Sequence, residues 1–140
     1  MVQTVAEVMT PAPVTISAED TVATAAGRMR DHDVGALIVS RGGRAVGILT
    51  DRDIVVRAVA DERGPDAAVG DVYSGDDLRL IHPETPIDEA VELMRRESVR
   101  RLPVVDGERR PVGIISLGDL AIERDDTSAL ADICAAEPNV

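Results

Sequence analysis

Apolar residues recur with helical spacing in two places along the chain. Between residues 16–39 and again between residues 81–104, they fall at positions i, i+3, i+4 and i+7, and the two sets lie 65 positions apart. The aligned pairs are Val22 and Ile87, Ala25 and Ala90, Ala26 and Val91, and Met29 and Met94. This spacing predicts two helices of about three turns, each with one apolar stripe. Asp20 and Thr85 suit the N-caps of these helices, and Pro86 suits a first helical position.

After each predicted helix, two short apolar runs enclose a polar turn. "ALIVS" (36–40) and "AVGILT" (45–50) enclose "RGGR", and "LPVVD" (102–106) and "PVGIIS" (111–116) enclose "GERR". This pattern predicts a strand, a turn and a strand in each half. Pro103 places its strand toward a sheet edge, or at a position where no N–H is needed. Further helices are predicted over residues 51–62 and 118–126.

The chain therefore contains one unit twice. Matching lead-ins, "VAEVMT" and "VGDVYS", precede the two units, which we place at residues 5–62 and 69–126 with a linker at 63–68. Residues 127–140 form a tail with one predicted short helix, which carries Leu130, Ile133 and Cys134 on one side.

A half of about 60 residues has a marginal core by itself, so the halves should bury their sheet faces against each other. We predict an α/β (α+β) fold of two β-α-β-β-α repeats with pseudo-twofold symmetry and two clefts between the repeats. The helix faces that carry Met29 and Met94 belong either to this core or to a dimer interface.

Composition narrows the classes of partner. Hydrophobic residues make up 44% of the 140, but aromatic residues only 1%, and the net charge is -11. Single-stranded nucleic acid is bound on aromatic faces, and an acidic surface repels phosphate backbones and anionic lipid, so we expect neither a nucleic-acid nor a membrane partner. The chain has one cysteine, and its N-terminus lacks the pattern of a signal peptide. We therefore expect a cytoplasmic protein.

One phrase that carries candidate chemistry is also repeated. "VGILTDRD" (46–53) contains Thr50 and ends in Asp53, and "VGIISLGD" (112–119) contains Ser116 and ends in Asp119. Each hydroxyl suits a helix N-cap, and each carboxylate is favoured at a helix N-terminus. Alternatively, a carboxylate can accept hydrogen bonds from both hydroxyls of a cis-diol, beside backbone N–H groups that suit an anion.

The sequence contains no glycine-rich phosphate-binding motif, and Cys134 has no evident basic partner along the chain. The scattered acidic residues do not form a metal-site pattern. We expect a protein that is not an enzyme, with no required cofactor and no metal.

Taken together, the motifs resemble a tandem pair of CBS (cystathionine beta-synthase) domains, also called a Bateman module. The matching segments are "MTPAPVTI" (9–16), "VGALIV" (34–39), "VGILTDRDIV" (46–55), "RRLPVVD" (100–106) and "VGIISLGDL" (112–120). The resemblance covers roughly residues 5–123. The chain is also similar to standalone CBS proteins of actinobacteria, of the hypoxic-response type.

The resemblance implies a site in each cleft for an adenosine-containing ligand: AMP, ADP, ATP or S-adenosylmethionine. Asp53 and Asp119 would hold the ribose, and Thr50 and Ser116 would contact a ribose or phosphate oxygen. A phosphate would be clamped by Arg101, with Arg100 beside it, unless the two arginines only form a solvated basic patch. Further candidates are Arg52 near the first cleft, Gly35, which aligns with Arg100, and an apolar slot for adenine, lined by Ile16, Val34, Ile81 and Val99. His82, near the cleft mouth, is interpreted as a solvated loop residue.

Two functions remain open at this point. The first is a regulatory sensor that binds an adenine nucleotide between its repeats and modulates an unidentified protein partner. The alternative is a stress-related dimeric scaffold with empty clefts, which acts through protein–protein contacts. We expect a homodimer in either case.

Overall fold

The computed structural model describes residues 3–74 and 79–124. The predicted tail helix, with Leu130, Ile133 and Cys134, lies outside these residues.

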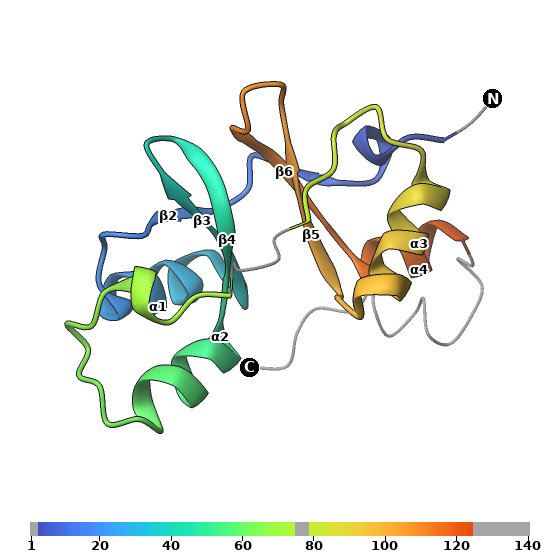
Figure 1. The fold of residues 1–140 in the computed structure, drawn as a ribbon. Coiled ribbons are helices and arrows are strands. Elements are labelled where there is room, and N and C mark those ends of the chain that lie inside the picture. Colours follow the sequence, from blue (N-terminus) through green and yellow to red (C-terminus); the bar gives the residue numbers. More distant parts are fainter. Residues whose placement is uncertain (1–2, 75–78, 125–140) are drawn as a thin grey trace.

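The chain forms two three-stranded sheets, one around the hairpin of each half (Figure 1). In the first sheet, β2 (Thr15–Ser17) runs parallel to β3 (Ala36–Arg41), which forms an antiparallel hairpin with β4 (Arg44–Thr50). The second sheet has the order β1-β6-β5. Its strands are β1 (Thr10–Pro11), β5 (Arg101–Val105) and β6 (Pro111–Ser116). Both predicted hairpins and the predicted mixed α/β class are confirmed.

In the second half, the strand that corresponds to β2 is reduced to one parallel bridge between Ile81 and Val104. Pro103 lies next to this bridge, and its carbonyl accepts the Ile81 N–H at 3.2 Å. The nitrogen of Pro103 therefore faces the Ile81 side and not β6, so the β5–β6 ladder needs no N–H there. The prediction for this proline is confirmed.

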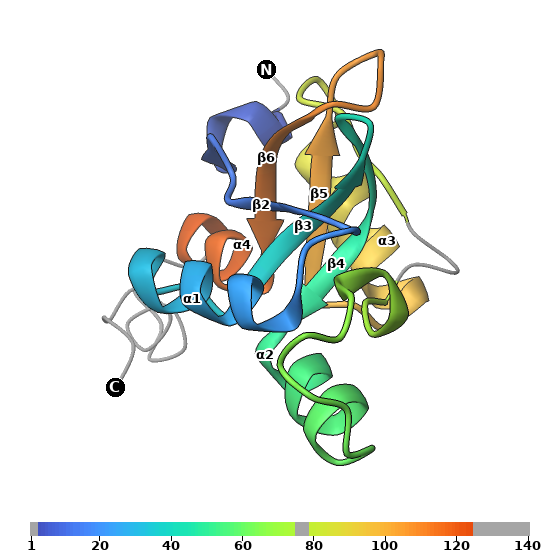
Figure 2. The same cartoon turned by 90° about the vertical axis from the view of Figure 1, so that its left-hand side faces the viewer.

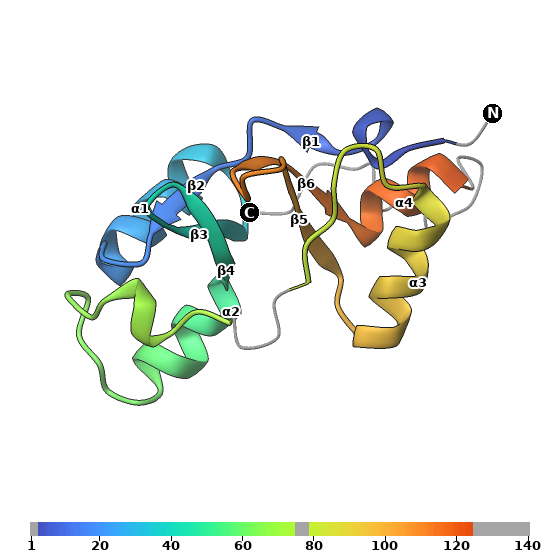
Figure 3. The ribbon, with the colours of Figure 1, turned by 45° about the horizontal axis from the view of Figure 1, so that its top comes forward.

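The two lead-ins are exchanged between the halves. The lead-in of the first half contains η1 (Val5–Glu7) and β1, and β1 pairs with β6 of the second half (Figure 3). The lead-in of the second half contains η3 (Val69–Asp71), and its Ser74 bridges Ile48 in β4. Each half therefore completes the sheet of the other.

This exchange explains the glycine in each copy of the repeated phrase. A Cβ at Gly47 would lie 2.3 Å from the Tyr73 ring and 2.6 Å from the carbonyl oxygen of Ser74. A Cβ at Gly113 would lie 2.4 Å from Sδ of Met9. The crossing lead-in lies against the strand at both positions, so any larger residue would have to displace it.

Two separate cores lie under the sheets, and each contains residues of the other half's lead-in. The first core is Ile16, Ala18, Val22, Ala25, Met29, Leu37, Val39, Leu49, Ala58, Val69 and Val72. The second core is Val5, Ile81, Ile87, Ala90, Met94, Leu102, Val104, Ile115 and Leu120. Met29 and Met94 are buried, so their helix faces belong to the internal cores and not to a free surface.

The two sheets face each other through a third, smaller cluster (Figure 2). Ile38, Ala45 and Val105 are fully buried there, with Leu80 and Ile114 packed against them. The tips of both hairpins point the same way, and the Ala45 N–H donates to the Arg109 carbonyl at 2.9 Å. The predicted burial of sheet against sheet is confirmed.

The first long helix, α1 (Val22–His32), begins one residue later than its predicted N-cap implies. Thr21 is the N-cap, and its hydroxyl accepts the Thr24 N–H at 3.1 Å. The prediction of Asp20 is wrong because its carboxylate accepts the Ser17 N–H, at 3.2 Å, in the turn before the helix.

The same correction applies to α3 (Ile87–Glu97). Pro86 is its N-cap and not its first helical residue. Thr85 is not the N-cap, because its hydroxyl accepts the His82 N–H at 3.1 Å in the preceding turn. In both halves a short polar side chain closes the turn, so the helix starts one residue further along.

The two remaining helices start directly at the ends of the hairpins. The first is α2 (Asp51–Asp53), which continues as the π-helix η2 (Ile54–Val59), where the Ala60 N–H reaches back to the Val55 carbonyl. In the second half, α4 (Leu117–Arg124) begins one residue before its predicted start. The last two residues of that predicted helix, 125 and 126, lie outside the described range.

Candidate functional site

Thr50 and Asp53 form a reciprocal capping box where β4 turns into α2. The Thr50 hydroxyl accepts the Asp53 N–H at 3.1 Å, and the Asp53 Oδ2 accepts the Thr50 N–H at 3.0 Å. Because both bonds span three residues, the local sequence is sufficient to build them. The N-cap interpretation of Thr50 is therefore confirmed, and its role toward a ligand stays a prediction.

Ser116 and Asp119 form the same box at the start of α4. The Ser116 hydroxyl accepts the Asp119 N–H at 3.1 Å, and the Asp119 Oδ2 accepts the Ser116 N–H at 2.9 Å. The repeated phrase thus builds the same local geometry twice, with a carboxylate held at a helix start in each half.

The two carboxylates differ in their remaining partners. Asp53 is 9% exposed, and its oxygens lie 3.3 Å and 3.4 Å from the Ser74 hydroxyl, with Nε of Arg57 at 3.9 Å. Asp119 is only half-buried, and within residues 3–74 and 79–120 its Oδ1 accepts no hydrogen bond. The first carboxylate is thus already engaged, whereas one oxygen of the second has no protein donor in that part of the chain.

Sequence reasoning did not identify Ser74 as a neighbour of Asp53. A signal was present, since both lead-ins end in a hydroxyl residue, Thr10 in "VAEVMT" and Ser74 in "VGDVYS". Thr10 pairs with Ile114 in β6, just as Ser74 bridges Ile48 in β4. The repeat alone could not show that each hydroxyl belongs to the other half's sheet.

Arg101 lies opposite Ser116 in the β5–β6 register. Directly opposed residues of an antiparallel pair share one face of the sheet, so Arg101 and Ser116 lie on the same face. The carbonyl of Arg100 accepts the Leu117 N–H at 2.8 Å, which holds the start of α4 against this strand. Both arginines are exposed, and neither guanidinium has a carboxylate partner within residues 3–74 and 79–120.

The first half has no basic residue at the positions that align with Arg100 and Arg101, because Gly35 and Ala36 stand there. The Gly35 carbonyl accepts the Asp51 N–H at 3.0 Å, and Ala36 is paired with Thr50. A Cβ at Gly35 would lie 3.1 Å from Oδ2 of Asp51, so the backbone is closely approached there. Arg52 is exposed next to this position. The structure therefore brings Arg101, Ser116 and Asp119 together, with no equivalent triad in the first half.

The four residues of the predicted adenine slot separate into two kinds. Ile16 and Ile81 are packed in the two cores, whereas Val34 and Val99 are exposed just after α1 and α3. His82 is exposed, as predicted, and its Nδ1 lies 3.1 Å from the Val105 carbonyl.

Described residues line two surface hollows away from the two capping boxes. One, of about 390 Å³, lies between the hairpin turns and is lined by Gly42, Arg44, Glu108 and Arg110. The other, of about 380 Å³, lies along α3 and includes Ile81 and His82. Of the predicted ligand-binding residues, only Ile81 lines either hollow.

Among residues 3–74 and 79–124, no three His, Cys, Asp or Glu side chains are grouped closely enough to hold a metal ion. Nor is any helix within the described residues long and apolar enough to cross a membrane.

Comparison with known proteins gives one consistent result. The CBS domain model matches residues 5–59 and 69–125. The CBS domain-containing protein YhcV of Bacillus subtilis is 39% identical over 120 residues, which are 86% of this chain and 84% of YhcV.

Solved structures agree with this match. The structure of Hypoxic Response Protein I with two coordinated zinc ions has a TM-score of 0.76 and 33% identity, over 85% of this chain and 97% of that chain. The CBS domain pair of protein MJ0100, in complex with 5'-methylthioadenosine and S-adenosyl-L-methionine, has a TM-score of 0.80 at 23% identity. That alignment covers 91% of this chain and 100% of the MJ0100 pair.

Proposed function

This chain belongs to the CBS-domain family as a tandem pair, and from that premise we propose that it is a cytoplasmic regulatory sensor for an adenosine-containing ligand. The ligand is AMP, ADP, ATP or S-adenosylmethionine. It binds between the repeats, without catalysis by this chain, and alters the protein's contact with a partner. The MJ0100 pair holds adenosine compounds on the same fold.

We place the ligand at the second-half capping box. The observation that carries this choice is the difference between the two aspartates. Asp119 keeps an oxygen without a donor in the described part of the chain, whereas Asp53 is already engaged by Ser74 and Arg57. A ribose diol needs a carboxylate that can still accept hydrogen bonds.

Arg101 supports the same choice. It lies across the strand pair from Ser116 and is exposed, with no carboxylate partner within the described residues. A guanidinium in that state can bind a phosphate through two parallel hydrogen bonds. Arg100 adds a second positive charge beside it, so phosphate-containing ligands should bind more tightly than uncharged nucleosides.

The test is thermal unfolding of the whole chain with AMP, ADP, ATP and S-adenosylmethionine at fixed salt. A ligand at about 100 times its dissociation constant adds about 2.7 kcal/mol of stability. For a domain of this size, this is a rise in Tm of roughly 5–10 °C. Asp119→Asn should remove the shift, because the amide replaces one acceptor oxygen with a donor while the side chain keeps its size.

Asp53→Asn is the matched control and should leave the shift in place. If Asp53→Asn removes the shift and Asp119→Asn does not, the ligand binds in the first half and our choice of site is wrong. If no ligand raises the Tm of folded protein, the sensor proposal fails. The dimeric scaffold then becomes the better function, and the contacts of Asp53 with Ser74 and Arg57 already favour it for the first half.

A further inference from the structure

The two halves differ along the outer edge of the sheet, where the chain passes beside the long helix. In the first half, Arg28 of α1 donates to the Thr15 carbonyl at 2.6 Å. The same guanidinium lies 3.8 Å from the Asp20 carboxylate. One guanidinium from the protein itself therefore satisfies an edge carbonyl and an acid of the first half.

The second half keeps this edge but has no such arginine. With the repeat offset of 65, Leu80 aligns with Thr15, Thr85 with Asp20, and Leu93 with Arg28. The Leu80 carbonyl points to the outer edge, as that of Thr15 does, because Ile81 directs its own N–H and carbonyl to β5. Within the described residues, no donor reaches the Leu80 carbonyl.

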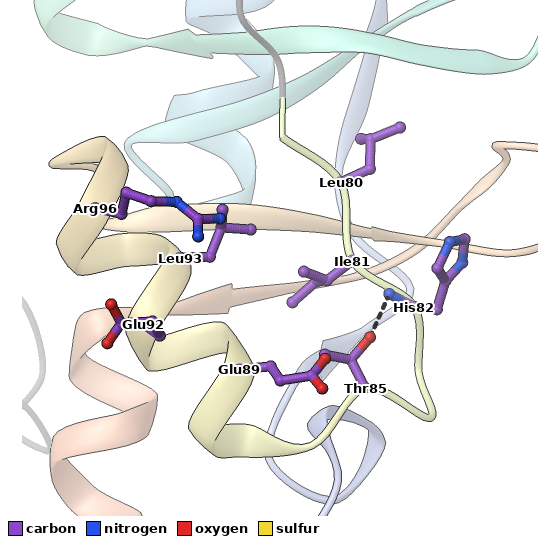
Figure 4. A pocket seen from close by; sticks show the side chains of 8 residues that line it. All are labelled: Leu80, Ile81, His82, Thr85, Glu89, Glu92, Leu93 and Arg96. Atoms are coloured by element: carbon purple, nitrogen blue, oxygen red, sulfur yellow. Dashed lines mark hydrogen bonds between the residues drawn. The ribbon is translucent and has the colours of Figure 1, made fainter.

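In the second half, a cavity of about 380 Å³ lies at the place that corresponds to the Arg28 guanidinium of the first half (Figure 4). Its lining residues are Leu80, Ile81, His82, Thr85, Glu89, Glu92, Leu93 and Arg96. This volume lies within the range of about 300–1,000 Å³ that is usual for small-ligand sites. The apolar side chains of Leu80, Ile81 and Leu93 also line it, so the polar groups of the lining would orient a ligand.

The charges at the two ends of the cavity have opposite sign. The Glu89 carboxylate points toward Thr85 at one end, and Arg96 lies at the other end near Leu93 (Figure 4). Glu89 has no cationic partner within the described residues, whereas Glu92 is paired with Arg95 at 3.5 Å and Arg96 with Glu97 at 3.8 Å. His82 lies on the rim, with its Nδ1 near the Val105 carbonyl.

We propose that this cavity binds a small molecule that carries a guanidinium group, which takes the place of the Arg28 side chain. The guanidinium donates to the Leu80 carbonyl and to the Glu89 carboxylate. A carboxylate on the same molecule would face Arg96, so a basic amino acid is the simplest compound that matches both ends. This site is separate from the capping boxes and does not depend on the proposed nucleotide site.

The test is a titration of ¹⁵N-labelled full-length protein with L-arginine at low salt, followed by amide shifts of Ile81 and Glu89. L-citrulline is the matched probe, because it replaces the guanidinium with a neutral group of the same shape. Arginine should give saturable shifts, and citrulline should bind at least about tenfold more weakly, as expected for the loss of a charged hydrogen bond.

Two variants locate the site. Glu89→Gln should weaken arginine binding about tenfold, while Glu84→Gln, the same change at an exposed position outside the cavity lining, should not. Leu93→Arg should abolish binding, since its own guanidinium would reach the Leu80 carbonyl as Arg28 reaches that of Thr15. If citrulline and arginine bind equally, or if Glu89→Gln binds arginine as tightly as the parent protein does, the proposal is overturned.

Agmatine carries the guanidinium of arginine but lacks its carboxylate, so it tests whether the carboxylate contributes to binding. Weaker binding of agmatine than of arginine supports a free basic amino acid, with Arg96 at its carboxylate. Equal binding supports the guanidinium site without a contribution from Arg96. Absence of saturable shifts with both probes in folded protein overturns the proposal.

Discussion

At the scale of single residues, the two glycines of the repeated phrase are set by contacts with the other half of the molecule. Gly47 lies under Tyr73 and the backbone of Ser74, and Gly113 lies under the Met9 side chain. The neighbours differ in how far they can move. A backbone carbonyl that is part of a strand bridge is held in place, whereas a methionine side chain can adopt another rotamer.

We therefore expect Gly47→Ala to be more destabilising than Gly113→Ala. Overpacking a closely packed site costs about 1–3 kcal/mol. The destabilisation by Gly47→Ala should lie at or above the upper end of this range, and that by Gly113→Ala near its lower end. Urea unfolding of both variants measures the difference. Gly107→Ala is the control, because a Cβ there meets nothing within 4 Å. Equal costs at Gly47 and Gly113 would contradict the explanation from neighbour mobility.

At the scale of elements, the repeat is built from turns and caps that depend on short polar side chains. The β5–β6 turn is held by Asp106, whose Oδ1 accepts the N–H groups of Glu108 at 2.8 Å and Arg110 at 2.9 Å. The hydrogen bond from the Arg110 N–H is the main reason why the pKa of Asp106 lies below its usual 3.8. This turn also supplies the Arg109 carbonyl that binds Ala45 of the first half.

The lowered pKa of Asp106 predicts a pH dependence of this turn. A carboxylate with a depressed pKa in the folded state stabilises the protein above the usual pKa of 3.8, and this contribution is lost as the pH falls through the lowered value. NMR titration below pH 4 should show the Glu108 and Arg110 amide signals moving together with protonation of Asp106. In Asp106→Asn this pH-linked movement should vanish, and its persistence would assign the titration to another group.

At the scale of the whole molecule, the exchange of lead-ins joins the two halves, and η2 carries an apolar cluster that is exposed among the described residues. Val5 is fully buried in the second core, and Val69 is fully buried in the first. On η2, by contrast, Val55 is 59% exposed and Val59 is 65% exposed, with Val56 beside them. An exposed apolar cluster of this kind is typical of a surface that contacts another protein.

We propose that η2 contributes to a homodimer interface. Val59→Glu should convert a dimer to a monomer in sedimentation velocity, because the interface would have to bury an unpaired carboxylate. Val99→Glu makes the same change after α3 and should leave the dimer intact. A dimer that survives Val59→Glu would place the interface elsewhere.

Much of this protein follows from local sequence. The helical spacing and the hairpins were predictable, because each depends on residues close together in the chain. That Pro103 lies where no N–H is needed was predictable from the missing N–H of proline itself. The Thr50–Asp53 and Ser116–Asp119 boxes belong to the same class, since their bonds span three residues. The predicted N-caps, Asp20 and Thr85, each lie one residue before the true N-cap, because both side chains close the turn just before the helix.

The tertiary structure decided the features that join distant parts of the chain. Sequence repetition shows that two units are alike, but it does not show which lead-in completes which sheet. Only the folded chain brings Ser74 to Asp53 and leaves Asp119 with a free acceptor among the described residues. Likewise, the Arg28 guanidinium occupies the outer sheet edge of the first half, whereas the second half has a cavity at the corresponding place. The physical reason is that a side chain's free hydrogen-bonding capacity depends on what packs against it, and these contacts come from the other half or from the far side of a helix.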